Sequence, residues 1–342
     1  MIVTKTICMN YQFVIGMDIS KHSFDLAILL ADSPKNIFHN AFNNDVKGFN
    51  EMMNFINETI PGFDVTRTLF CMEATGLYCN SLLQFFETQR ANVWVENAVQ
   101  MKRSMGIKRG KTDKVDSISI AKYAFKNAEL IRLWKPGSAV LEKIKHLATL
   151  RERMVVTQKR LLTPIEELRD AGQGKMADLL YKSIKKSINA LDADLKNIEA
   201  KIMEYLREDA SLNHLFSLIT SVVGIGFVTA INLIIHTQGF NVMCDSRKLA
   251  CYCGVAPFPY QSGISIKGRT KVNHMANKKL KTNLHLAALT AIRYDPELKT
   301  YYDRKVLEGK SKMSVINAVR YKLLARVVSV VKNDREYVKK TA

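Results

Sequence analysis

Four acidic residues constrain the fold of this chain more than any other feature, because each stands where a predicted strand or helix begins or ends. They are Asp18, Glu73, Asp113 and Asp116. The first closes an apolar run at residues 13–17, the second follows another at 68–72, and the last two are spaced i, i+3 behind Thr112. Clustered carboxylates are tolerated where divalent metal ions neutralise them. The pattern therefore predicts an α/β sheet with a metal site suited to a nuclease or strand-transfer enzyme.

The segments around these acids are typical of strand, strand and helix. Residues 24–31 alternate as a strand paired with the first would. Gly76 ends the later strand and residues 77–88 continue as a helix, which places Glu73 at a carboxyl end, where open sheets carry chemistry. The preceding threonine is an expected N-cap, and the spacing turns both aspartates to one helix face. Each acid alone would suit a solvated or helix-capping role, so the metal site rests on their conjunction.

The overall charge indicates a polyanionic partner. The 342 residues contain 51 Lys plus Arg against 32 Asp plus Glu, a net charge of +19. Nucleic acid fits this charge better than a membrane does, because no uncharged apolar stretch of about 18 residues occurs. The N-terminus lacks a long signal-peptide core, so a cytoplasmic, soluble protein without membrane contact is expected.

Composition shifts along the chain predict three domains. Residues 1–135 alternate between strand and helix patterns and form an α/β domain. Pro136 and Gly137 then stop regular structure. Residues 136–212 are predicted to form a helical arm, and residues 213–342 a mostly helical C-terminal domain. The fold class is therefore α/β plus all-α.

The predicted arm contains a heptad seam, with apolar residues at alternating spacings of four and three. The seam consists of Ile184, Ile188, Leu191, Leu195, Ile198 and Ile202. A break at Gly172-Gln173-Gly174 separates it from an earlier helical segment. An antiparallel helical hairpin and an intermolecular coiled coil both satisfy this pattern. The arm is accordingly either a spacer or a dimerisation element.

A glycine-rich turn opens the C-terminal domain at Gly224-Ile225-Gly226. It is similar to the hairpin of a helix-hairpin-helix motif, in which backbone N–H groups approach a phosphate. Three residues carry little specificity, so a tight helix–helix turn explains the motif equally well.

Basic residues gather in two places. Six Lys or Arg residues and no acid occur between 265 and 283, just after a hydroxyl- and glycine-rich loop at 260–269: Lys267, Arg269, Lys271, Lys278, Lys279 and Lys281. A second group precedes the two aspartates and comprises Lys102, Arg103, Lys108, Arg109 and Lys111. Such runs suit a solvated face, but hydroxyls beside them in a flexible loop suit phosphate contact. Binding through these charges should depend strongly on salt.

A serine in the first of these regions can attack phosphorus if its proton is removed and the phosphate oxygens are polarised. Chemistry alone does not select Ser262 for that role. The cysteines offer no metal site, since the six of them form no Cys-x-x-Cys pair. Cys251 and Cys253 are expected to be small reduced core residues.

Six ordered motifs together resemble one family over essentially the whole chain. They are Gly16-x-Asp18-x-Ser20-Lys21, Glu73-Ala74-Thr75-Gly76, Lys111-Thr112-Asp113-x-x-Asp116, Gly224-Ile225-Gly226-x-x-Thr229-Ala230, Gly254-Val255-Ala256-Pro257 and Gln261-Ser262-Gly263-x-Ser265-x-x-Gly268. The family is the DEDD-type transposases of bacterial insertion sequences, insertion-sequence family one-ten, also called bridge-RNA-guided recombinases. DNA invertases of the pilin-inversion type are close relatives.

The resemblance implies a ribonuclease-H/resolvase-like N-terminal domain, a coiled-coil arm and a C-terminal transposase domain with a catalytic serine. It implies that the four acids hold Mg²⁺ (or Mn²⁺) and that Ser262 forms a covalent phosphoserine link to DNA. It also implies a homo-oligomer, from dimer to tetramer, in which one subunit's acids and another's serine complete a composite site. The expected partners are donor DNA, target DNA and a structured guide or bridge RNA. Lys21 of the first motif joins the candidate nucleic-acid contacts.

Some alternatives stay open. Val223 stands where relatives often carry Pro, and Ser265 lies close enough to Ser262 to compete as nucleophile. A junction-resolving nuclease could use the four acids with water. An actin-like or sugar-kinase ATPase shares the underlying sheet, although the charge argues against it. A non-catalytic nucleic-acid-binding protein and a site-specific DNA invertase complete the set. Target sequences, and the choice among insertion, excision and inversion, do not follow from the residues.

Overall fold

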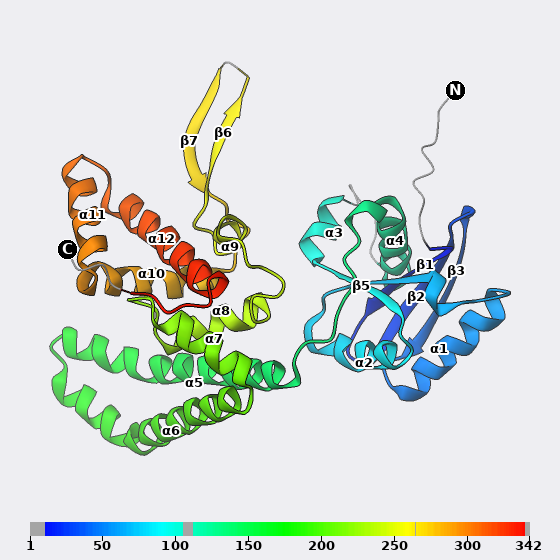
Figure 1. The fold of residues 1–342 in the computed structure, drawn as a ribbon. Coiled ribbons are helices and arrows are strands. Elements are labelled where there is room, and N and C mark those ends of the chain that lie inside the picture. Colours follow the sequence, from blue (N-terminus) through cyan, green and yellow to red (C-terminus); the bar gives the residue numbers. More distant parts are fainter. Residues whose placement is uncertain (1–10, 105–111, 264, 339–342) are drawn as a thin grey trace. The chain divides into compact units, whose positions relative to one another are not determined.

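The computed structural model describes residues 11–104, 112–263 and 265–338. The chain divides into two compact units, Met1–Pro136 and Gly137–Ala342, so the division falls at the Pro-Gly step noted in the sequence (Figure 1). The further division predicted at residue 212 stays a prediction. Among the described residues, no helix is long and apolar enough to cross a membrane.

The first unit is built on a five-stranded mixed sheet with the order β3-β2-β1-β4-β5. Strand β1 pairs antiparallel with β2, and β2 with β3, whereas β1, β4 and β5 run parallel. The strands are β1 (Phe13–Ile19), β2 (Ser23–Leu30), β3 (Ser33–Asn43), β4 (Thr68–Glu73) and β5 (Asn92–Glu96). This mixed α/β sheet is consistent with the expected ribonuclease-H-like domain.

Helices cover both faces of this sheet (Figure 1). They are α1 (Val46–Thr59), α2 (Asn80–Thr88), α3 (Ala98–Ser104) and α4 (Asp113–Lys126), with the short 3-10 helices η1 (Val65–Arg67), η2 (Gly76–Cys79) and η3 (Ala128–Leu130). Side chains of α1 and α2, such as Met52 and Phe86, form one buried core with Ile15 and Met17 of β1. Side chains of α3 and α4 form a second core on the opposite face. The sheet therefore has an α1/α2 face and an α4 face.

The second unit begins with two long helices, α5 (Ala139–Asp170) and α6 (Gly174–Glu208), joined by a turn in which Gly172 has a φ of 77°. They run antiparallel, because Arg151 Nε lies 2.6 Å from Glu199 Oε1 and Gln158 donates to Asp192. Of the two structures that the heptad seam allows, the antiparallel helical hairpin therefore forms within the chain. A role of this pair as a coiled-coil dimerisation arm stays a prediction.

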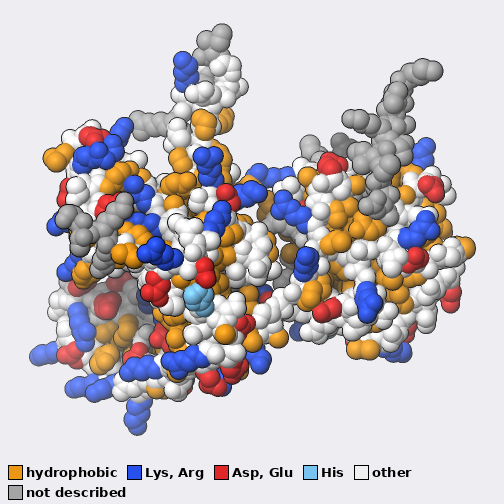
Figure 2. All heavy atoms as spheres, viewed as in Figure 1, with side chains coloured by type: hydrophobic (Ala, Val, Ile, Leu, Met, Phe, Trp, Pro, Cys, Tyr) orange, Lys and Arg blue, Asp and Glu red, His pale blue; other side chains and the backbone are white. Residues whose placement is uncertain are grey.

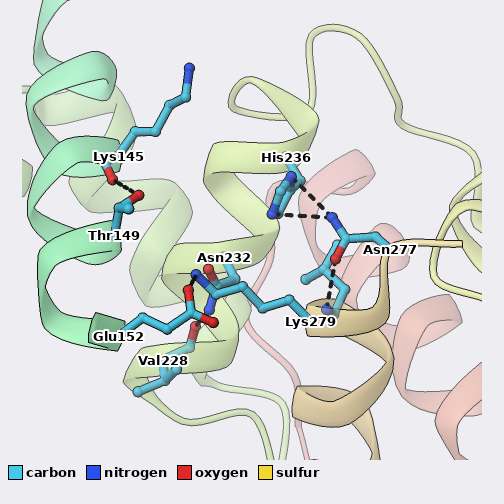
Figure 3. Close-up of polar contacts among 9 residues, drawn as sticks. Lys145, Thr149, Glu152, Val228, Asn232, His236, Asn277 and Lys279 are labelled. Atoms are coloured by element: carbon cyan, nitrogen blue, oxygen red, sulfur yellow. Dashed lines mark hydrogen bonds and ion pairs between the residues drawn. The ribbon is translucent and has the colours of Figure 1, made fainter. Parts of the chain in front are cut away.

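The remaining helices are α7 (Ala210–Thr220), α8 (Phe227–Thr237), α9 (Ser246–Tyr252), α10 (Lys278–Tyr294), α11 (Pro296–Leu307) and α12 (Lys312–Lys332). They share one hydrophobic core with the base of the α5–α6 pair, including Ile144 and Ile202. Figure 3 shows the polar side of this junction, where Lys279 of α10 lies 2.6 Å from Glu152 of α5. Beside them, Asn277 contacts His236 of α8, whose pKa is lowered by burial and by the charge of Lys279.

The segment expected to be a flexible loop at 260–269 is instead part of a β-hairpin, β6 (Pro257–Ser262) and β7 (Ile266–Val272). The hairpin projects away from the helices of its unit (Figure 1). Every residue of β6 is exposed, so no buried face produced an alternating pattern. The C-terminal region is mostly helical, as predicted, with this two-stranded addition.

Candidate active site and nucleic-acid interface

Strand alternation decides where Asp18 points. Successive side chains of a strand point to opposite faces, and Val14 lies in the core of the α4 face while Ile15 and Met17 lie in the other core. Asp18 follows Val14 by four residues, so it shares the α4 face. On β4, Cys71 lies in the core of the α4 face, and Glu73 follows it by two residues, so Glu73 also points to the α4 face. Two of the predicted acids therefore leave one surface of the sheet from neighbouring parallel strands.

Gly16 lets α4 lie directly on this surface. A Cβ at Gly16 would overlap the backbone nitrogen of Ala121 and the carbonyl oxygen of Ser117, both in α4. Only a glycine leaves room for this approach. Ser117, one turn into α4, is fully buried where the helix contacts β1. The first turn of α4, which precedes Ser117, therefore lies beside the end of β1 and carries its two aspartates there.

The start of α4 is fixed by a cap. The Thr112 side chain accepts a hydrogen bond from the Val115 N–H at 3.3 Å, which confirms the predicted N-cap. Asp113 and Asp116 then fall in the first turn, where the helix dipole favours negative charge. Asp113 is exposed and Asp116 is half-buried.

The four predicted acids lie close enough to interact electrostatically. Burial and then repulsion from Asp116, Asp113 and Glu73 raise the pKa of Asp18 from 3.8 to about 6, with a smaller contribution from Asp25. Like charges produce such a shift only at short range. The structure thus brings together the acids that the sequence separates by about a hundred positions.

The donor set suits a divalent cation by its chemistry, because hard cations prefer carboxylate oxygens. In the parts of the chain that the structure describes, no group of three or more His, Cys, Asp or Glu side chains is arranged to hold a metal ion. The described carboxylates therefore lie close enough to repel one another but not close enough to share one ion as ligands.

Sequence reasoning missed two acids on the same face. Glu96 ends β5 opposite Glu73, where it accepts a hydrogen bond from the Tyr123 hydroxyl at 3.2 Å. Asp25 pairs with Asp18 across β1 and β2 and lies 2.7 Å from His39 Nε2. The sequence does contain a pattern that predicts Glu96, because residues 93–96 are a short apolar run that ends in an acid, like the runs before Asp18 and Glu73.

The candidate serines occupy the tip of the β6–β7 hairpin. Ser262 is the last residue of β6, its register partner is Ile266, and it is exposed. Gly263 follows with a φ of 57°, a conformation that favours glycine. Ser265 lies in the turn before β7 and is also exposed. The motif glycine Gly268 faces Tyr260, and a Cβ there would lie 2.8 Å from the tyrosine ring.

Comparison with known protein families matches both halves of the chain. Residues 15–169 match a family described as "Transposase", of the DEDD type of the IS110 group. Residues 216–303 match the family described as "Transposase IS116/IS110/IS902 family". This chain carries the domains of an IS110-family transposase. The protein is therefore a DNA transposase or recombinase.

Similar proteins agree with this assignment. The chain is 28% identical over 332 residues to the "Pilin gene-inverting protein" of Moraxella bovis, covering 95% of this chain and 98% of that protein. It is 31% identical over 134 residues to the "Insertion element IS110 uncharacterized 43.6 kDa protein" of Streptomyces coelicolor, covering 39% and 32% of the two chains. It is also 28% identical over 164 residues to the "Insertion element IS900 uncharacterized 42 kDa protein" of Mycobacterium paratuberculosis, covering 48% and 40%.

The DEDD transposase domain implies use of a divalent metal, and the family implies a DNA substrate. On the face of the molecule that Figure 2 shows, Lys and Arg side chains are spread over both units. The described candidates for DNA contact that are exposed are Lys21, Lys102, Arg103, Lys267, Lys271 and Lys278. Lys108, Arg109 and Lys111 lie outside the described residues, as does the side chain of Arg269.

Other predicted contacts of the transposase have structural roles as well. Lys279 is half-buried and is held by its ion pair with Glu152. Gly224 has a φ of 94°, and a Cβ there would lie 2.5 Å from the Ala287 carbonyl oxygen of α10, so close helix packing explains it. Gly226 caps α8 with open space around it, which leaves that helix start accessible. Phosphate contact at either glycine stays a prediction.

The prediction that both Cys251 and Cys253 lie in the core is wrong for one of them. Cys253 is fully buried, as expected, and burial raises the pKa of its thiol to about 12. Cys251, expected in the core beside it, is exposed instead. The two lie at the end of α9 and just after it, where the helical period and not strand alternation sets their direction.

Proposed function

We propose that this transposase exchanges DNA strands with the acids Asp18, Glu73, Asp113 and Asp116 and the nucleophile Ser262. The observation that supports the proposal is geometric: Asp18 and Glu73 leave the α4 face from neighbouring parallel strands, and α4 lies directly on that face at Gly16. Burial and the three other acids of the set accordingly raise the pKa of Asp18. Buried like charges are costly and cluster at functional sites. A bound divalent ion, Mg²⁺ in this proposal and Mn²⁺ as its substitute, would relieve the repulsion and polarise a phosphodiester oxygen.

The serine supplies the covalent step. The Ser262 hydroxyl gives up its proton, its oxygen bonds to phosphorus, and one deoxyribose oxygen leaves the phosphorus and takes up a proton. The new phosphoserine ester keeps the bond energy of the diester, and attack by a second strand's hydroxyl reverses the step. No external energy source is needed. Exposure of Ser262 at a hairpin tip supports this role, because the hydroxyl can reach a bulky duplex.

The assembly belongs to the same proposal. Family resemblance suggests a homo-oligomer, from dimer to tetramer, in which acids and serine act on one phosphodiester, and a structured guide or bridge RNA that pairs with donor and target DNA. The net charge of +19 supports contact with several nucleic-acid strands. Inversion is one of the possible outcomes, given the name of the Moraxella relatives.

The test is a covalent-adduct assay on labelled DNA taken from either side of the reading frame. Wild type and Ser265→Ala are expected to form protein–DNA adducts that survive SDS, whereas Ser262→Ala forms none yet binds DNA unchanged. Asp18→Asn is expected to form none either. Adducts with Ser262→Ala would exclude this serine. Cleavage without adducts in wild type would instead identify a hydrolytic junction-resolving nuclease that uses the same acids with water.

A further inference from the structure

A cavity of about 810 Å³ lies at the base of the β6–β7 hairpin. Helices α9 and α12 supply most of its wall, and Pro257 of β6 and Thr270 and Val272 of β7 also line it. Its volume is in the range of sites that hold small organic molecules. The surface that lines it is mostly apolar, with Val255, Met313 and Tyr321 among the contributors.

Arg320 of α12 lines this cavity and is the unusual residue in it. It is only 6% exposed, and its Nε is buried without a hydrogen-bond partner. Its Nη2 contacts Nδ1 of His285, and burial and the charge of Arg320 lower the pKa of that histidine. Among the described residues no carboxylate forms an ion pair with it. A buried, unpaired cation costs folding free energy, so its retention calls for an anionic partner from outside the chain.

A neighbour on the same helix shows what a structural arginine looks like here. Arg326 lies 2.6 Å from Asp295 Oδ2 and 2.8 Å from Glu297 Oε2, so its charge is balanced within the fold. Arg320, six residues earlier on the same helix, has no carboxylate partner among the described residues. The contrast indicates that Arg320 is not simply a packing residue of α12.

Two further cations line the same cavity, the exposed Arg247 of α9 and the half-buried Lys281 of α10. The site therefore joins three positive charges to a mostly apolar wall that includes a tyrosine. Free inorganic anions would use only the charges. A nucleotide uses both parts, because its phosphate suits the guanidinium groups and its base can stack on an aromatic or apolar surface.

We propose that this cavity holds one unpaired nucleotide of the nucleic-acid strand on which the transposase acts, with its phosphate on Arg320 and its base against the apolar wall. Pro257 belongs to the cavity and Ser262 lies five residues further along an extended strand, roughly 17 Å away. A strand held in the cavity would thus run along the hairpin. The inference concerns binding and holds whether or not Ser262 is the nucleophile.

The first test is binding of a labelled 12-nucleotide single strand and of the matching duplex. Arg320→Met is expected to weaken single-strand binding by roughly 10- to 100-fold, as loss of a charged hydrogen bond does, and duplex binding far less. The control Arg293→Met removes an exposed charge of α10 and should change both affinities alike and only slightly. DNA and RNA single strands are compared to learn which strand the cavity prefers.

Stability provides an independent measurement. Removing an unpaired buried charge should leave the melting temperature of Arg320→Met without nucleic acid unchanged or higher. A lower melting temperature with unchanged single-strand affinity would assign Arg320 a structural role and overturn the proposal. Ser314→Trp, which fills the cavity from its rim and keeps Arg320, should weaken single-strand binding in the same way. Unchanged binding by that variant would also count against the site.

Thiol labelling reports on the cavity directly, because Cys251 is exposed and lines it. In a Cys8→Ser, Cys244→Ser background, the single strand should slow reaction of Cys251 with a maleimide at least several-fold. Inorganic phosphate or thymidine alone should protect much less than thymidine monophosphate. Equal protection by phosphate would mean an adventitious anion site. These assays measure binding, stability and thiol reactivity, and none of them requires strand exchange. The nucleotide site and the proposed strand-exchange chemistry can therefore be disproved independently of each other.

Discussion

The acids and the serine of this transposase are held in opposite ways. The acids leave a sheet whose two faces are both buried, and α4 is pressed onto β1 at Gly16. The serine stands at the tip of a two-stranded hairpin whose first strand is exposed along its whole length. Isolated two-stranded hairpins are marginally stable in water. Packing therefore holds the elements that carry the proposed acidic site, whereas no buried face of β6 holds the proposed nucleophile.

A side chain added at Gly16 should damage the packed region more than any other single change that we propose. Gly16→Ala places a Cβ onto the backbone of α4. Because backbone atoms cannot rotate away, we expect a loss of about 3 kcal/mol or more in unfolding free energy, together with loss of metal-dependent DNA cleavage. Urea unfolding measures it. Gly174→Ala, at an open helical position, is the control and should be neutral or slightly stabilising. Equal stability of both variants would contradict the close approach.

The charge on Asp18 gives the next effect. Its folded pKa of about 6 exceeds the ordinary 3.8, so the ionised carboxylate opposes folding, and this cost develops between about pH 4 and pH 6 and is complete above pH 6. Asp18→Asn should therefore melt higher than wild type at pH 7.5 and equally near pH 4. Mg²⁺ should raise the melting temperature of wild type at pH 7.5, and a chelator should reverse this.

In the Asp18→Asn variant the magnesium effect should be much reduced. Asp303→Asn serves as control for the loss of one carboxylate in the second unit. A wild type that gains no stability from Mg²⁺ or Mn²⁺ would count against the four acids as the metal site.

The hairpin side is tested by Gly268→Ala. The new Cβ meets the Tyr260 ring at 2.8 Å, and an exposed ring can turn aside. We expect a change of less than about 1 kcal/mol in unfolding free energy, as for most exposed sites. Adduct formation should still fall clearly, because the new Cβ also lies 3.2 Å from the Tyr260 backbone oxygen and so pushes the two strands apart near the tip. Equal losses of unfolding free energy in Gly268→Ala and Gly16→Ala would show that the hairpin and the sheet are equally sensitive to an added side chain, contrary to this prediction.

The smallest difference that we expect is between substitutions of Glu73 on β4 and Glu96 on β5, which are register partners. Glu73→Gln should abolish most of the magnesium-induced rise in melting temperature. Glu96→Gln should reduce it only slightly, because Glu96 already accepts hydrogen bonds from Tyr123 and from the Asn97 N–H. Titration of each variant with Mg²⁺ measures both. A larger effect at Glu96 would make it a fifth member of the acidic set.

The sequence predicts the packed region well, for a physical reason. Buried strands such as 13–19 and 68–73 must be apolar, and the acids that end them interrupt that pattern visibly. The same holds for α4, whose cap at Thr112 and first-turn acids are local features. Strand β3 was not predicted, because most of its residues are exposed and it begins with Ser33, Pro34 and Lys35.

The hairpin could not be predicted in the same way. A strand with no buried face needs no alternation, and its glycines and hydroxyls favour a loop on composition alone. The cavity beneath it was also invisible, because its lining comes from segments as distant as Arg247 and Tyr321. Nor does any local pattern show that Arg320 lacks a carboxylate partner, since that depends on every side chain packed around it.

The alternation of β1 makes the acidic site intolerant of changes in chain length. Deleting one residue between positions 13 and 17 would shift every later side chain of the strand to the opposite face. Ile19 would then stand among the carboxylates and Asp18 would be driven into the hydrophobic layer beneath α1. No single amino-acid replacement could repair such a deletion. A library that varies the length of β1 should therefore yield active transposases only when the number of residues in this strand is kept, even if Gly16 and Asp18 are both retained.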